Sequence, residues 1–152
     1  MIANQFLPRA YICQFELLAP RGTHQLENLD KSIPFLFKSI EFAQKNKRYN
    51  FLVYNASVIF WKYARAFLKV NFKRYLCVSL KKITQALKDI DDADFEWRAT
   101  LERTLIEAYI DNKQANEANS LAAELNKFIK ANVPNMFDEY FEFLVGFCLD
   151  LV

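Results

Sequence analysis

The chain has 152 residues, of which 53% are hydrophobic and 16% aromatic, and its formal net charge is +2. This composition is too apolar for a disordered protein, and a chain of this length typically buries about 70% of its unfolded surface. Only 2 glycines and 4 prolines are present, whereas β-sandwiches and β-barrels need many turns made by these residues. The composition therefore predicts a single all-α domain.

The first half of the chain is expected to form three helices. The first covers residues 5–19, with apolar side chains at helical spacing (Phe6, Ala10, Cys13, Leu17 and Leu18). The second ends near residue 46 and begins either near residue 28 with a kink or near residue 32, because Pro34 fits best in a first turn. The third covers residues 49–69 and is apolar except for one polar stripe: Asn55, Lys62, Arg65 and Lys69. Those polar residues also make a membrane span a poor interpretation of this segment.

The second half is expected to form four more helices. An amphipathic helix over residues 72–90 has a basic outer face, and a helix over residues 95–111 follows, with Asp94 as its N-cap. The sixth ends near residue 131, and Pro134 opens the seventh. The seventh helix carries a strongly apolar face: Phe137, Tyr140, Phe141, Leu144, Val145, Cys148 and Leu149. We expect that face to pack on more chain or on another subunit.

The spacing of the expected helices indicates a repeat. Paired in chain order, they form hairpins that begin near residues 6, 49, 95 and 135, a period typical of helical solenoids. In the third hairpin, Leu105, Tyr109 and Ala118 match three positions of the tetratricopeptide pattern. The sequence therefore predicts a tetratricopeptide-like helical hairpin array, an α-solenoid of about seven helices, with residues 1–152 as one segment of a longer solenoid.

No catalytic, metal or cofactor motif is recognisable. Gly22 and Gly146 lack the context of a phosphate loop, and His24 has no metal-ligating companion. The acidic run at residues 89–94 lacks the glycine of a calcium loop and fits a capped turn better. Three cysteines, Cys13, Cys77 and Cys148, are far apart, which predicts buried free thiols. Because the first residues contain no secretory signal, we expect an intracellular protein. Because no catalytic motif is present, we expect that it is not an enzyme.

Charge is segregated along the chain. Residues 42–88 contain 11 Lys or Arg and no acid, whereas residues 89–107 contain 7 acids and 2 Arg. The candidate partner-binding residues on the basic hairpin are Lys62, Arg65, Lys69, Lys73, Arg74, Lys81 and Lys88. They suit an acidic partner such as a tubulin tail, an acidic helix or a neighbouring subunit, or they only keep the array soluble. Nucleic acid is not expected, because the aromatic residues fall on buried faces.

Several stretches resemble a known family in order and spacing: FLPRAYICQFELLAP (6–20), RYNFLVYNASVIFW (48–61), EWRATLERTLIEAYI (96–110) and FIKANVP (128–134). They resemble the N-terminal region of the cilia- and flagella-associated protein forty-six family, large tetratricopeptide proteins of motile cilia. The resemblance implies a structural component of the axonemal central apparatus, on a projection of a central-pair microtubule. It also implies large ciliary proteins as partners, with tubulin as a candidate, and no catalytic residue. Tyr54, Asn55, Trp61 and Trp97 transfer only as packing positions.

Two functions remain open at this point. The first is a non-enzymatic scaffold in a hetero-oligomeric assembly of the cytoskeleton, in the cytoplasm and ciliary axoneme. The second is a soluble adaptor that binds acidic peptides or tails in the groove of its array. An enzyme is the remote third.

Overall fold

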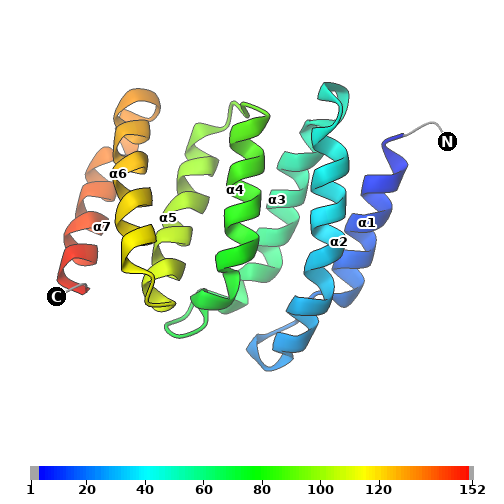
Figure 1. The fold of residues 1–152 in the computed structure, drawn as a ribbon, viewed down its shortest axis with the longest axis horizontal. Helices are drawn as coiled ribbons and strands as arrows, with labels where there is room; N and C mark the ends of the chain where they lie inside the picture. The colour runs from blue at the N-terminus through cyan, green and yellow to red at the C-terminus, as the bar shows by residue number, and fades with distance from the viewer. Residues whose placement is uncertain (1–3, 151–152) are drawn as a thin grey trace. The chain divides into compact units, whose positions relative to one another are not determined.

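The computed structural model describes residues 4–150, and the side-chain surroundings of residues 4–146. Within that range the chain is all-α and has seven α-helices and no β-strand, which confirms the predicted class and suits a helical repeat array. The helices are α1 (Phe6–Leu18), α2 (Leu26–Gln44), α3 (Phe51–Ala64), α4 (Cys77–Asp89), α5 (Phe95–Asp111), α6 (Ala115–Asn132) and α7 (Phe137–Asp150) (Figure 1). Five short 3-10 helices occupy the connections: η1 (Thr23–Gln25), η2 (Lys47–Tyr49), η3 (Arg65–Phe67), η4 (Lys73–Leu76) and η5 (Pro134–Met136).

The chain is divided into two compact units. The first consists of Met1–Lys69 and Lys81–Asp92, and the second of Val70–Leu80 and Ala93–Val152. In the first unit α1, α2 and α3 pack on one another; in the second, α5 and α6 form a hairpin, η4 packs on α5 and α7 packs on α6. Helix α4 begins in the second unit and continues into the first.

Helix α1 has nearly the predicted bounds, but the expected apolar face is wrong. Phe6 and Leu17 are 65% and 82% exposed, whereas Pro8, Ile12 and Phe15 are buried. The helix is apolar around most of its circumference, so helical spacing alone does not select a face. The neighbouring helices select it: the buried Ser39 hydroxyl of α2 donates a 2.9 Å hydrogen bond to the Pro8 carbonyl, and the Phe15 ring packs edge-on against Tyr63.

Helix α2 starts at Leu26 and continues through Pro34, which agrees with the expected start near residue 28 and rules out the one near residue 32. Proline inside a helix removes one backbone donor and crowds the carbonyl four residues earlier. Here both Pro34 and Asp30 are exposed, so water can reach the carbonyl that loses its partner. The buried face of α2 is formed by Leu29, Ser32, Leu36, Ser39, Ile40 and Ala43.

Helix α3 is shorter than expected, because it ends at Ala64 and continues as η3. Its buried side chains are Leu52, Val53, Ala56, Ser57, Phe60, Tyr63 and Ala64. Asn55, Lys62, Arg65 and Lys69 are exposed as the polar stripe predicts, although Phe51 and Val58 are also 46% and 43% exposed. No helix among residues 4–150 is long and apolar enough to cross a membrane.

The second unit follows the predicted pattern closely. Helix α5 has the expected bounds, and the Asp94 side chain accepts a 3.0 Å hydrogen bond from the Trp97 amide, which confirms the N-cap. Helical spacing places Trp97, Leu101, Leu105, Ala108 and Tyr109 on one face, and all of them are buried except Trp97, which is half-buried. Ala118, Ala122, Leu125 and Ile129 line the buried side of α6. The fourth helix differs at its start, because residues 73–76 form η4 before α4 begins.

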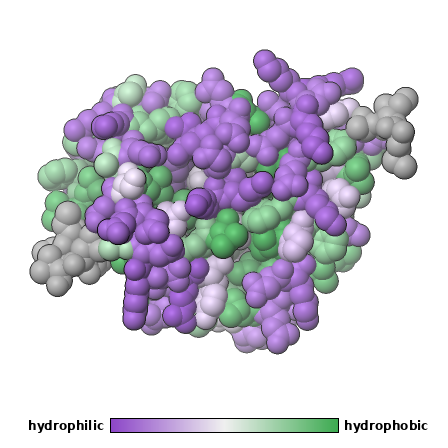
Figure 2. Space-filling view, in the orientation of Figure 1, coloured by the Kyte–Doolittle hydropathy of each residue, from purple (hydrophilic) through white to green (hydrophobic). Residues whose placement is uncertain are grey.

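The prediction of buried thiols is corrected, and the predicted apolar face of α7 lies partly outside the described side chains. Cys77 is buried, but Cys13 is exposed on α1, so burial of all the thiols is wrong. On α7, Tyr140 is buried while Phe141 and Val145 are 54% and 48% exposed. Figure 2 shows hydrophobic residues over α7 at the edge of the visible face. The side chains of Cys148 and Leu149 lie outside the described residues.

Candidate interaction surfaces

The first unit carries five of the seven predicted basic residues. Lys62 on α3 is 68% exposed, and its Nζ lies 3.8 Å from Glu16 Oε1 on α1. Arg65, Lys69 and Lys81 are exposed, and none of these three forms an ion pair within the part of the chain that the structure describes. Lys88, near the end of α4, is half-buried. Of these five predicted residues, Arg65, Lys69 and Lys81 are therefore the ones that are both exposed and without an ion pair within residues 4–146.

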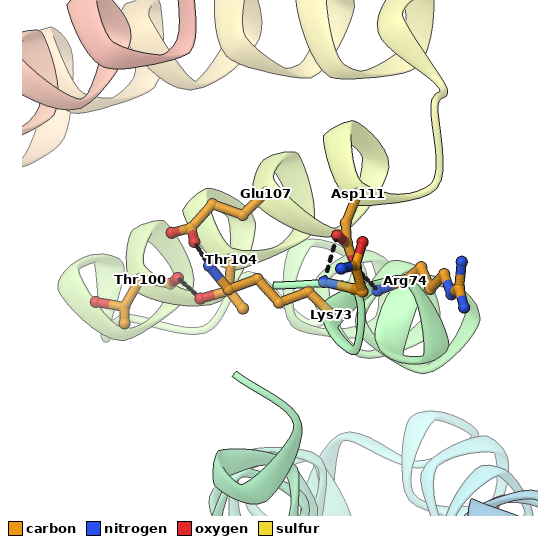
Figure 3. Close-up of polar contacts among 7 residues, drawn as sticks. Lys73, Arg74, Thr100, Thr104, Glu107 and Asp111 are labelled. Carbon is orange, nitrogen blue, oxygen red and sulfur yellow. Dashed lines mark hydrogen bonds and ion pairs between the residues drawn. The ribbon is translucent and has the colours of Figure 1, made fainter. Parts of the chain in front are cut away.

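Lys73 and Arg74 belong to the second unit, where the Arg74 side chain is exposed and its guanidinium donates a 3.1 Å hydrogen bond to the neighbouring Tyr75 hydroxyl. Lys73 forms an ion pair with Glu107 on α5, and both side chains are largely buried (Figure 3). The Asp111 carboxylate at the end of α5 accepts hydrogen bonds from the backbone amides of Asn71 (2.8 Å) and Arg74 (3.0 Å). These contacts fix η4 on α5. The charge of Lys73 therefore stabilises the fold. This role cannot be predicted from local sequence, because Glu107 lies 34 residues away.

A groove of about 550 Å³ opens in the second unit between α5, α7 and the segment before η4. Its apolar wall includes Val70, Ile110 and Phe143, and its charged lining is Lys73, Arg103, Glu107 and Asp111. Lys73 pairs with Glu107, and Arg103 pairs with Glu139 on α7 while lying over the Phe143 ring. Because the lining holds equal numbers of acids and bases, this groove does not select an acidic ligand.

A second groove, of about 330 Å³, lies in the first unit between α1, α2 and α3. Its lining consists of Pro8, Arg9, Ile12 and Cys13 from α1, Ser39 from α2, and Leu52, Asn55 and Ile59 from α3. Arg9 is the one charged residue in this lining. Arg9 is not recognisable as a site residue in the sequence, because it comes to lie across from α3 only in the folded unit. The signal that pointed here was Asn55, on the polar stripe of α3.

Three groups of the second unit, Cys77, Tyr109 and Tyr140, have raised pKa values. Burial raises the pKa of the Cys77 thiol to about 11, and the negative charge of Asp111 adds to the effect. Burial also raises the pKa of Tyr140, with a contribution from Glu102. The Tyr140 hydroxyl donates a 2.7 Å hydrogen bond to the Ala122 carbonyl and so joins α7 to α6. Burial raises the pKa of Tyr109, with smaller effects of Cys77 and Glu117.

The remaining polar features of the second unit are structural. Arg98 lies with its guanidinium carbon 3.7 Å from the Phe128 ring centre, and its Nε is 3.6 Å from the buried Glu102 carboxylate. The Arg98–Phe128 contact joins α5 to α6, whereas the Arg98–Glu102 pair lies within α5. Among the residues that the structure describes, no group of three or more His, Cys, Asp or Glu could hold a metal ion.

The two units have opposite formal charges. The first contains 13 Lys or Arg and 7 Asp or Glu, a net charge of +6, whereas the second contains 7 and 11, a net charge of −4. The weak overall charge of +2 therefore conceals a basic unit and an acidic unit. A net positive charge of this kind attracts negatively charged groups to the first unit.

These features define the class of an all-α protein built from helical hairpins, with grooves that lie between α1 and α3 and between α5 and α7. No family model matches the chain. A Chlamydomonas reinhardtii protein described as "Cilia- and flagella-associated protein 46" is 26% identical to it over 106 residues. The match covers 66% of this chain and 4% of the relative, so the chain spans only a small part of the length of that protein. This level of identity indicates a distant relationship.

Proposed function

We propose that this chain is a non-enzymatic structural scaffold segment of the motile cilium. The observation that carries the proposal is the match of 106 residues with a protein named for its association with cilia and flagella. The all-α hairpin architecture supports it, because stacked hairpins present long surfaces on which other proteins assemble.

The proposal extends to a particular place in the cilium. We place the segment in the central apparatus of the axoneme, in a projection of a central-pair microtubule, as residues 1–152 of a longer solenoid. Its partners there are other large ciliary proteins, with tubulin as a candidate, in a hetero-oligomeric assembly of the cytoskeleton. The support for this finer assignment is the resemblance of four sequence stretches to the family, in the same order along the chain.

The basic unit supplies the contact chemistry for such a role. Arg65, Lys69 and Lys81 are exposed and not engaged in ion pairs within residues 4–146, so they are available to an acidic neighbour. Lys73 contributes less, because Glu107 already neutralises it. The partner-binding set is therefore narrower than the seven basic residues that sequence alone suggests.

The test is localisation of the tagged chain in motile ciliated cells. After detergent removal of the ciliary membrane, we expect the chain to stay with the axoneme, and to be lost from axonemes of a mutant strain that lacks the central pair. Retention in central-pair-less axonemes would overturn the central-apparatus assignment. Absence from cilia altogether would overturn the scaffold proposal.

A second candidate function is an adaptor for acidic peptides. It is favoured by the groove between α1 and α3, which has a cation and no acid in its lining. An adaptor binds an isolated acidic peptide reversibly, whereas a scaffold co-assembles stably with large folded partners. Co-purification from axonemes, compared with direct peptide titration, separates the two.

A further inference from the structure

The groove between α1 and α3 combines a cation, an amide and an apolar wall. Arg9 and Asn55 are exposed, and neither makes a side-chain hydrogen bond or ion pair to another residue of the described part of the chain. Ile12 and Leu52 are buried at its base, and Ile59 is half-buried beside them. Polar groups that are exposed and without partners can bind a ligand without first breaking an internal contact.

The nearest acid on α1 does not compete for Arg9. Glu16 lies two turns along the helix, outside the groove lining, where Lys62 Nζ is 3.8 Å away and the Tyr63 hydroxyl donates to it at 3.2 Å. The buried Ser39 hydroxyl is also occupied, because it donates to the Pro8 carbonyl. The positive charge of Arg9 is therefore uncompensated at this end of the groove, in a unit whose formal net charge is +6.

We propose that this groove binds an internal acidic segment of a partner protein, in which a Glu or Asp side chain lies next to a large aliphatic residue. The carboxylate accepts hydrogen bonds from the Arg9 guanidinium and the Asn55 amide, and the aliphatic side chain packs on Ile12, Leu52 and Ile59. Arginine suits this role, because its planar fork can bind both oxygens of one carboxylate. The proposal deepens the adaptor function and rests on it.

The experiment uses the full chain and a fluorescein-labelled synthetic peptide with a Leu–Glu–Leu core, a Gly/Ser background and a C-terminal amide. We expect saturable binding by fluorescence anisotropy that weakens as salt concentration rises. Arg9→Gln should weaken binding by about tenfold or more, which corresponds to a charge-assisted contact. Arg21→Gln removes another exposed positive charge of the same unit, outside the groove, and should change binding by less than about twofold. Equal loss in both variants would overturn the proposal and indicate nonspecific attraction.

Matched peptides identify the chemical group that is bound. A Leu–Gln–Leu peptide with an amidated end should bind weakly. A Leu–Gln–Leu peptide with a free C-terminal carboxylate should bind no better; strong binding of that peptide would overturn the choice of an internal side chain. A Gly–Glu–Gly peptide tests the apolar wall, and affinity equal to that of Leu–Glu–Leu would refute its contribution.

Cys13 provides an independent readout, because it lines the same groove and is exposed. Saturating Leu–Glu–Leu peptide should slow alkylation of Cys13 by iodoacetamide, as measured by mass spectrometry of the Cys13 peptide. Unchanged Cys13 alkylation despite anisotropy binding would place the peptide elsewhere and overturn this site while leaving an adaptor function intact. No binding of any acidic peptide would overturn both this site and the adaptor, whereas axonemal localisation tests the scaffold separately.

Discussion

Asp111 joins the segment that begins η4 to the end of α5, and its removal tests how that contact stabilises the second unit. In Asp111→Ala, the backbone amides of Asn71 and Arg74 lose an acceptor that lies 2.8 and 3.0 Å away. A capping carboxylate contributes about 0.5–2 kcal/mol, and hydrogen bonds to a charged group contribute about 1.5–3 kcal/mol. Because Asp111 is partly exposed, these hydrogen bonds stabilise the fold by less than the upper values. Its negative charge at the C-terminus of α5 is also unfavourable by about 0.3–1 kcal/mol.

The expected net loss in the free energy of unfolding is about 1–2 kcal/mol, measured by denaturant unfolding followed by circular dichroism. Asp111→Asn keeps one acceptor oxygen and should lose about half as much. Asp30→Ala, an exposed acid of α2, is the matched control and should change stability by less than about 0.5 kcal/mol.

A second readout distinguishes loss of this contact from general damage. Asp111 is the smaller of the two causes that raise the Cys77 pKa to about 11. In Asp111→Ala the thiol pKa should fall and still exceed 9.0, because burial, the larger cause, is retained. If Asp111→Ala were as stable as Asp30→Ala and left the Cys77 titration unchanged, the inferred role of Asp111 would be refuted.

The other predictions concern the turns, the thiol and the core. Lys113 and Asp91 follow α5 and α4 with φ of 60° and 52°, so Lys113→Gly and Asp91→Gly should each stabilise by about 0.5–1 kcal/mol; a lower denaturation midpoint would contradict this. The Cys77 pKa is raised from 9.0 to about 11, so its thiol ionises first in the unfolded chain. The free energy of unfolding should therefore fall between about pH 9 and pH 11, and less steeply in Cys77→Ala; equal slopes would argue against burial of a neutral thiol. Tyr140→Phe leaves the buried Ala122 carbonyl without its 2.7 Å partner and should cost about 1–3 kcal/mol in thermal or chemical unfolding. An unchanged midpoint would show that water or another donor replaces the hydroxyl.

The sequence by itself determined the class of fold and most of the helices. Scarce glycine and proline leave few turns, and apolar residues recur with a period near 3.6, so local preference and core burial both favour helices. Helix α5 shows this best, because Asp94 caps its start and its bounds match the prediction. The left-handed turn residues Asp91 and Lys113 were not predicted, since neither is the glycine that normally signals such a turn.

The tertiary structure decided which faces are buried and which charges remain free. Helix α1 is apolar on several sides, and its contacts with α2 and α3, among them the Ser39 hydrogen bond to Pro8, select the face that is buried. Lys73 looks like a surface cation in the sequence, yet Glu107 neutralises it after folding. Arg9 and Asn55 are 46 positions apart and line one groove because α1 and α3 are neighbours. Helical periodicity is set by local geometry, whereas these pairings depend on side chains far apart in the chain, and only packing brings them together.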